Sequence, residues 1–410
     1  MRRYAVLIIA GGLVLLTGAT ALFIRINADA AWEVMRIRTL ELAAEAKARP
    51  SNRPVLRGTA EPGNAWTDYE AEVTPGGIDS TTRSTLEEYL DRKPGADAQA
   101  VERLVAGHAL DIEAFRRGTR RAEGGFAYDW DRGTQLKLPD YIRFQDLVWL
   151  TVAKARLQKE SGRPGEAAEL LLDTAQACGD FRRNSTYLSE LSGIRYMFVA
   201  YDDLLELLKS KSLSAQDLAK VELELEILDL NWSDFGISLR NEAIFAQFHL
   251  LTGDRLAEVN PPFLGSWRYA FSQDLMVADA SSWILLCVNV AVQLESKPWP
   301  EHLKEAETLR REMDKGRNPL AHYVNYGNPW ASSRVRHRRS QLRMLRVATR
   351  YWLDGSVTEL PDPFGDKLRT IRTNTGLKVW SVGGDGIDNG GIGGWYLSDQ
   401  VPDIVLEISK

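Results

Sequence analysis

The sequence is poor in the residues that most often carry chemistry. Its 410 residues include only two cysteines and five histidines. No two histidines stand three or four residues apart, so the metalloprotease motif HExxH is absent. The nucleophile elbow GxSxG and the phosphate loop GxxxxGK[ST] are absent too. We therefore predict that the protein is not an enzyme, and we keep a hydrolase without a recognisable motif as an alternative.

The two cysteines, Cys178 and Cys287, are far apart in sequence, and each lies in a segment with a helical pattern. No CxxC pair or Cys/His cluster is present, which excludes the usual structural zinc motifs. In an oxidising compartment the two thiols could form a disulfide bridge. The alternative, which is the commoner arrangement for two such residues, is that each is a small core residue.

An excess of positive charge is also lacking. There are 51 Lys and Arg against 56 Asp and Glu, a net charge of −5, so we predict no nucleic-acid partner. The most basic stretch, "RVRHRRSQLRMLRVATR" at 334–350, has two interpretations. It can bind an anionic partner such as lipid headgroups, or it can form a solvated helical face. We favour the face, whose buried side would hold Val335, Leu342, Leu345, Val347 and Ala348.

One long hydrophobic run is present. Ala5 to Ile24 carries no charge and is flanked by Arg2, Arg3 and Arg25. About 20 apolar residues in a helix match the thickness of a bilayer core. We predict a transmembrane anchor at residues 5–24, with Arg2 and Arg3 in the cytoplasm and the rest of the chain extracytoplasmic. The predicted location is the cytoplasmic (inner) membrane, crossed once. Because residues 28–30 read Ala-Asp-Ala, a pattern that signal peptidase accepts, a cleaved signal peptide is the alternative.

The remaining sequence is mostly helical by pattern. We predict an anchor or signal at 1–26, a juxtamembrane helix and a Pro/Gly-rich linker at 27–80, a helical body at 81–352 and a β tail at 353–410. The clearest part of the body is a helical hairpin, 146–161 and 165–178. The helix that starts after Ser214 opens with a capping-box pattern, with Asp217 at the third position.

The tail changes from helical to strand patterns. "LRTIRT" (368–373), "LKVWSV" (377–382) and "DIVLEI" (403–408) read as three short strands, and "NTG" (374–376) reads as a hairpin turn. We predict a small antiparallel β-meander that packs on the preceding helix, 336–352. The fold class is therefore mostly α, with an N-terminal transmembrane helix, a multi-helix body and this meander.

A glycine-rich loop, "WSVGGDGIDNGGIGGW" at 380–395, connects the second and third strands. Calcium takes six to eight oxygen ligands, and glycines let backbone carbonyls turn inward. The candidate oxygens belong to Asp385, Asp388, Asn389, Asp399 and Asp403. The calcium-binding β-helix repeat GGxGxD occurs once, at 383–388, without tandem copies, so a β-helix is excluded. A solvated turn without a metal is the alternative.

The run "LPDPFGDKLRTI…LKVWSVGGDGIDNGG…PDIVLEI" resembles the C-terminal part of the major pseudopilins of type II secretion, over about fifty residues. The resemblance implies a calcium ion held by Asp385 and Asp388 and by main-chain oxygens of Ser381 and Val382. The N-terminal run lacks the processing signal of those proteins, so pilin processing is not implied. The rest of the chain is similar to uncharacterised membrane-anchored helical proteins of planctomycete-type bacteria.

These features predict a membrane-anchored extracytoplasmic scaffold or interaction protein with an unidentified protein partner. The alternative suggested by the tail is an accessory component of a type II secretion machine or of a similar pseudopilus-like machine.

Overall fold

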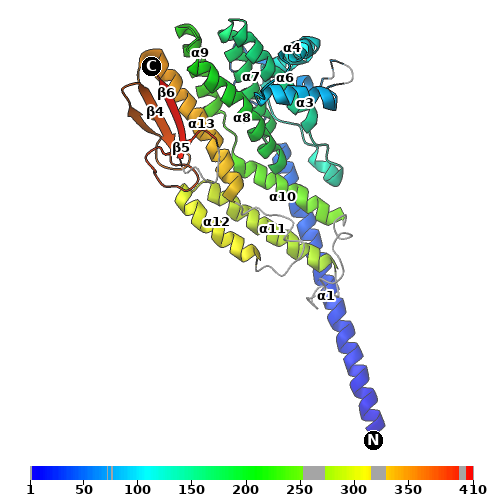
Figure 1. The fold of residues 1–410 in the computed structure, drawn as a ribbon. Coiled ribbons are helices and arrows are strands. Elements are labelled where there is room, and N and C mark those ends of the chain that lie inside the picture. Colours follow the sequence, from blue (N-terminus) through cyan, green and yellow to red (C-terminus); the bar gives the residue numbers. More distant parts are fainter. Residues whose placement is uncertain are drawn as a thin grey trace.

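The computed structural model describes residues 2–71, 73–74, 77–252, 273–314, 329–396 and 403–409, and most of their side chains from residue 22 onward. These residues form thirteen α-helices and a small C-terminal sheet (Figure 1). The prediction of a mostly helical chain with a β tail is confirmed.

The first helix, α1 (Arg2–Lys47), is continuous from the predicted anchor into the predicted juxtamembrane helix. Its N-terminal part projects from the body, and its C-terminal part packs on α10 (Phe235–Thr252) and α11 (Gln273–Glu295) (Figure 1). There Thr39 donates a hydrogen bond to the Gln247 side chain. The side chains of residues 5–21 and of Ile24 lie outside the described residues, so the transmembrane anchor stays a prediction.

Another helical window is also apolar enough to cross a membrane by length and composition. Among the residues whose side chains the structure describes, only Val277–Glu295 in α11 meets that criterion, and 50% of the window is buried inside the molecule. Core helices of globular domains have the same character, and α11 packs on α1, α10 and α12 (Trp299–Asp314).

The Pro/Gly-rich part of the segment 27–80, expected as a linker, contributes to the core. It contains β1 (Glu61–Asn64), which pairs in parallel with β2 (Arg121–Glu123), and the short helix α2 (Trp66–Tyr69). Trp66 lies 5.7 Å, centroid to centroid, from the ring of Phe144. Prolines and glycines end regular structure, but they do not prevent the aromatic side chains between them from being buried.

The body continues with further helices, which pack both on their neighbours in sequence and on more distant helices. They are α3 (Ser80–Leu90), α4 (Ala98–Gly107), α5 (Ala109–Gly118), α6 (Tyr141–Glu160), α7 (Pro164–Arg182), α8 (Tyr187–Lys209) and α9 (Ala215–Leu230), with a 3₁₀ turn η1 (Trp130–Gln135) before α6. The predicted hairpin is α6 with α7. The predicted capping box is confirmed, because Ser214 and Asp217 each accept a hydrogen bond from the other's backbone N–H.

The last helix, α13 (Pro329–Asp354), joins the body to the tail. It packs on α8, α9 and α12 and also on β4 (Gly376–Ser381) and β6 (Asp403–Ser409) (Figure 1). The expectation that the sheet packs on this helix is confirmed. One cluster of buried side chains runs from Trp66 in the body through Leu345 in α13 to Val379 in the tail. The tail therefore shares the core of the body.

The sheet has the order β3-β4-β6-β5, with β3 at Arg369–Arg372 and β5 at Gly393–Gly394. The β3–β4 and β4–β6 pairs are antiparallel, as predicted. The prediction of a purely antiparallel meander is wrong, because β5 pairs with β6 in parallel. A Cβ atom on Gly393 would lie 1.9 Å from the Asp403 carbonyl oxygen, so this close pairing requires glycine.

The two cysteines are free and buried in different clusters. Cys178 belongs to the main core, and Cys287 belongs to a second cluster formed around α1, α10 and α11. Of the two alternatives raised by the sequence, the structure has the independent core residues.

Candidate functional site

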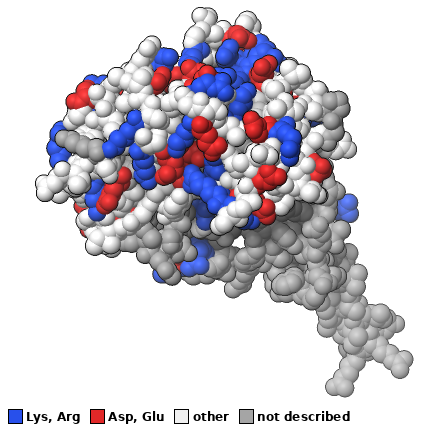
Figure 2. All heavy atoms as spheres, turned by 45° about the horizontal axis from the view of Figure 1, so that its top comes forward, with Lys and Arg blue, Asp and Glu red and all other residues white. Residues whose placement is uncertain are grey.

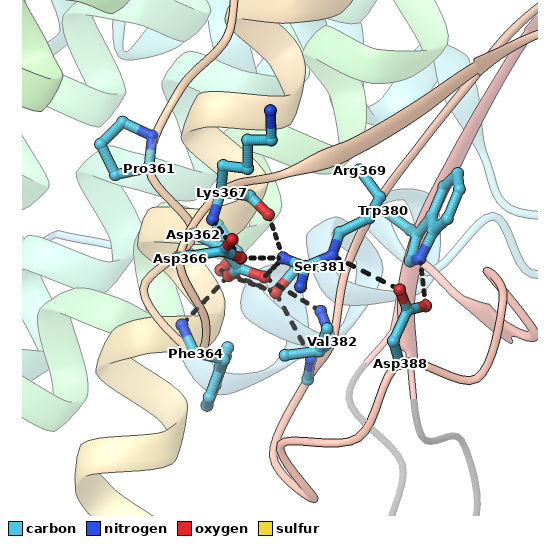
Figure 3. Close-up of polar contacts among 12 residues, drawn as sticks. Pro361, Asp362, Phe364, Asp366, Lys367, Arg369, Trp380, Ser381, Val382 and Asp388 are labelled. Carbon is cyan, nitrogen blue, oxygen red and sulfur yellow. Dashed lines mark hydrogen bonds and ion pairs between the residues drawn. The ribbon is translucent and has the colours of Figure 1, made fainter. Parts of the chain in front are cut away.

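The glycine loop follows β4 and is held at its start by a residue from another turn. Asp362, in the "PDPFG" turn that precedes β3, is 3% exposed. Its carboxylate accepts hydrogen bonds from the Ser381 hydroxyl at 2.6 Å, from the Val382 N–H at 3.0 Å and from the Phe364 N–H at 3.0 Å (Figure 3). Burial raises the pKa of Asp362 against the effect of these donors. The turn and the loop are therefore joined by one buried carboxyl group.

The predicted calcium ligands Ser381 and Val382 are placed by this contact. Ser381 is fully buried at the end of β4, and its hydroxyl is directed at Asp362 (Figure 3). Val382 is 3% exposed. Sequence reasoning missed Asp362 as a partner of these residues. The available signal was the pairing of a DP-x-G turn with the SVGG loop in the pseudopilin-like segment.

The two predicted carboxylate ligands lie in the loop itself, and both already accept hydrogen bonds. Asp385 accepts from the Ile387 N–H at 2.9 Å and from the Asn389 side chain at 3.1 Å. Asp388 accepts from the Trp380 indole at 3.0 Å and from the Gly390 N–H at 3.0 Å (Figure 3).

The hydrogen bonds that Asp388 accepts also change the pKa of its carboxyl group. The bonds from Trp380 and Gly390 hold the pKa of Asp388 below its ordinary value, and nearby Arg369 acts in the same direction. Asp388 is therefore ionised at neutral pH.

The remaining candidate oxygen ligands belong to Asn389, Asp399 and Asp403. Asp403, at the start of β6, accepts from the Gly391 N–H at 2.8 Å, and burial raises its pKa. Asp399 lies outside the described residues. Asn389 bonds to Asp385 and, through its backbone N–H, to Asp403 at 3.4 Å. The far side of the loop is thus tied to β6.

Backbone carbonyls in the loop also have protein partners. The Gly383 carbonyl accepts from the Gly386 N–H at 3.2 Å, and the Gly384 carbonyl accepts from the Trp299 indole at 2.9 Å. In the described part of the chain no group of three or more His, Cys, Asp or Glu is placed to hold a metal. Hydrogen bonds within the protein thus order this loop as described, and calcium binding stays a prediction.

A second candidate site is a cleft of about 620 Å³ beside α3, α5 and α6. His108 and Asp111 line it, with 3.0 Å between the Nδ1 of His108 and the carboxylate. Burial raises the pKa of Asp111, but hydrogen bonds from Thr74 and His108 outweigh it and leave the pKa lowered. Asp111 therefore orients the imidazole ring of His108 through Nδ1.

The cations of this cleft are paired. Arg83 binds Asp146 through two bonds of 2.8 Å, and Lys137 lies 3.0 Å from Glu70. Among the described residues that line the cleft none is Ser, Thr or Cys. In this polar cleft an oriented imidazole lies beside carboxylates and their paired cations. Because its residues come from separate helices, no local motif could have revealed it.

The arginine-rich helix α13 is a structural element rather than a surface site. Its predicted apolar side is confirmed, because all five predicted residues are buried. The prediction that the arginines form a solvated face is wrong. Arg339, Arg343 and Arg346 all bind Asp229 at the end of α9, at 3.0, 2.9 and 3.1 Å. One carboxylate thus anchors three guanidinium groups between two packed helices.

These three arginines are therefore held by the protein itself and do not form a free basic patch. On the face of the molecule that Figure 2 shows, Lys and Arg alternate with Asp and Glu. Comparison with family models, curated proteins and solved structures finds no match for this chain.

Proposed function

We propose that this protein is a membrane-anchored extracytoplasmic scaffold, in which a helical body is held at the membrane surface by α1. The observation that supports this proposal is the continuity of α1. The helix begins at Arg2, includes the apolar run and ends at Lys47, where its C-terminal part is buried in the body. A helix without a break transmits position and orientation, whereas a flexible linker would not.

The packing of α1 is specific. Met35 and Ala43 are 5% and 1% exposed, and Thr39 is fully buried with its hydroxyl bonded to Gln247. Directly after the helix, the Arg49 guanidinium donates to Asn241 at 2.6 Å. The body is therefore fixed to the second half of α1 by apolar and polar contacts together.

The exposed residues at the end of the apolar run support the same proposal. Leu22, Phe23 and Ile26 are 61%, 68% and 58% exposed. Fully burying one such side chain stabilises a protein by about 1.5–3 kcal/mol, which makes their exposure to water unfavourable. A position at the membrane would cover them, either with lipid or with another helix beside α1.

The test is membrane fractionation of the full chain. We expect it to stay with the membrane after extraction at alkaline pH and to be released only by detergent. Replacing two residues of the run, Leu13 and Leu16, with Arg is expected to release the folded body, because each charge at a bilayer centre is costly. Recovery of the unaltered protein in the soluble fraction, with a new N-terminus at Ala31, would contradict the proposal.

The second proposal is an accessory role in a secretion machine, and the contact between Asp362 and Ser381 favours it. That hydrogen bond joins the two segments that carry the pseudopilin-like pattern. Crosslinking in native membranes followed by a pull-down tests this role. Recovery of secretion components is expected, and their absence from a preparation that contains other crosslinked partners would count against it.

A further inference from the structure

The helix α1 has a second apolar face, opposite the one that packs on the body. Its buried residues recur on one side of the helix: Ala28, Met35, Thr39, Ala43 and Ala46. Its exposed large apolar residues recur on another: Leu22, Phe23, Ile26, Val34, Ile37 and Leu40. At about 3.6 residues per turn the exposed set occupies a sector of roughly 120° that does not overlap the buried sector.

The spacing of this exposed face follows a heptad. The first heptad position holds Phe23, Ala30, Ile37 and Ala44, which stand seven residues apart. The fourth heptad position holds Ile26, Glu33 and Leu40. All seven are exposed in the structure. Apolar residues at these two positions form the seam of a two-stranded coiled coil. A helix that only had to hold the body would need apolar residues on one side.

We propose that this face of α1 binds the same face of a second copy of the chain, in a parallel helix pair just outside the membrane. The parallel arrangement rests on the proposed membrane anchor, because two copies inserted in one bilayer have their α1 helices parallel and at the same height. No rotation of the body is needed, since the body occupies the opposite side of the helix.

The charges beside the seam fit a parallel pair. Arg36 borders the seam on one side and Glu41 borders it on the other, five residues later. In a parallel coiled coil these two positions of neighbouring chains lie next to each other, so opposite charges meet. Two charges fall on seam positions, Glu33 and, at the last residue of the helix, Lys47. The Glu33 carboxylate already binds Arg36 of the same helix at 2.7 Å. Its charge is therefore largely balanced before two copies meet.

Disulfide crosslinking of the full chain in native membranes tests the pair. Ile37→Cys lies in the seam, and Arg38→Cys, the next residue, is equally exposed but outside it. Cys178 and Cys287 are buried and give the background. After mild oxidation we expect Ile37→Cys and Ala44→Cys to form a product of twice the chain mass, at least tenfold more than Arg38→Cys. Adding Leu40→Glu to Ile37→Cys should reduce the product several-fold without lowering the melting temperature.

Two results would overturn the proposal. Equal yields from Ile37→Cys and Arg38→Cys, or no dimer from either seam cysteine, would show that lipid or solvent covers this face. A crosslinked product of another mass would identify a different partner. Membrane fractionation tests the proposed anchor independently of the helix pair. If the chain is soluble and Ile37→Cys still forms the dimer, the helix pair is supported and the membrane anchor is contradicted.

Discussion

The Asp362 carboxylate and the Ser381 hydroxyl form a 2.6 Å hydrogen bond between two buried groups. This contact joins the turn before β3 to the end of β4, and the same carboxylate accepts from two backbone N–H groups. Asp362 therefore acts as the internal support of the tail.

Replacing Asp362 tests that role. In Asp362→Asn the oxygen that accepts from the Val382 N–H becomes an NH₂ group, which cannot accept that bond, whereas the other oxygen can keep the bonds from Ser381 and Phe364. We expect the free energy of unfolding to fall by about 1–3 kcal/mol, because a buried N–H loses its partner. Urea unfolding followed by tryptophan fluorescence measures the change. Asp366→Asn, in the same turn but exposed, is the matched control, and equal effects of the two substitutions would contradict the role of Asp362.

Calcium binding by the glycine loop has its own test. If Asp385 and Asp388 hold the ion, calcium at a hundredfold excess over Kd should stabilise the protein by about 2.7 kcal/mol. Asp385→Ala should abolish that gain, whereas Asp366→Ala should keep it. Thermal melts in calcium and in chelator measure both. Identical melting temperatures in the two buffers would show that the hydrogen bonds of the loop are sufficient to order it.

The ion pair between Arg53 and Asp180 is fully buried, with both side chains 0% exposed. Tyr69 donates a third contact to the same carboxylate at 2.7 Å. Removing one partner leaves an uncompensated charge, so we expect Arg53→Met to destabilise the protein by about 3–5 kcal/mol. The exposed pair Arg132 and Asp129 provides the control, and Arg132→Met should change the melting temperature little. Similar melting temperatures for the two variants would refute the structural role of the buried pair.

The pH dependence of stability should carry a contribution from Glu224. Burial raises the pKa of this carboxyl to about 7, and Asp173 and Glu169 act in the same direction against Arg57. The ordinary value is 4.5, so the folded state binds more protons between the two values. The stabilising contribution of Glu224 to the free energy of unfolding is therefore fully present below pH 4.5 and is lost as the pH rises through about 7.

The substitution Glu224→Gln removes that titration. We expect the difference in unfolding free energy between pH 5 and pH 8 to shrink by up to about 3 kcal/mol, because each pH unit between the folded and unfolded pKa values contributes about 1.36 kcal/mol. Urea unfolding at both pH values measures it. Glu222→Gln on the same helix is the control, and an unchanged pH dependence in Glu224→Gln would show that Arg57 keeps this carboxylate ionised.

The parts of the fold that depend on local pattern could be predicted from the sequence. The capping box at Ser214 and the antiparallel pairs of the tail are set by neighbouring residues, and both are present. The parallel strand at Gly393 could not be predicted, because two glycines carry no strand pattern and pair only through their backbone. The burial of the α13 arginines depends on Asp229, more than a hundred residues earlier in the chain, and no periodicity reports a contact at that distance.

The candidate site shows the same division. The sequence predicted that Ser381, Val382, Asp385 and Asp388 belong to one loop, because they are close along the chain. It did not predict which groups they contact. Asp362 and Trp299 reach the loop from separate elements, and both bonds depend on how α12, α13 and the sheet pack together.

If α1 anchors the chain as we propose, its unbroken helix would also make the protein sensitive to the bilayer itself. At about 1.5 Å per residue its 46 residues extend roughly 69 Å, of which the apolar run covers less than half. A rigid rod embedded at one end tilts when the hydrocarbon layer becomes thinner than its apolar length. Because the body is packed on the other end, each degree of tilt turns the body by the same angle. The face that the body presents to its surroundings would then depend on membrane thickness.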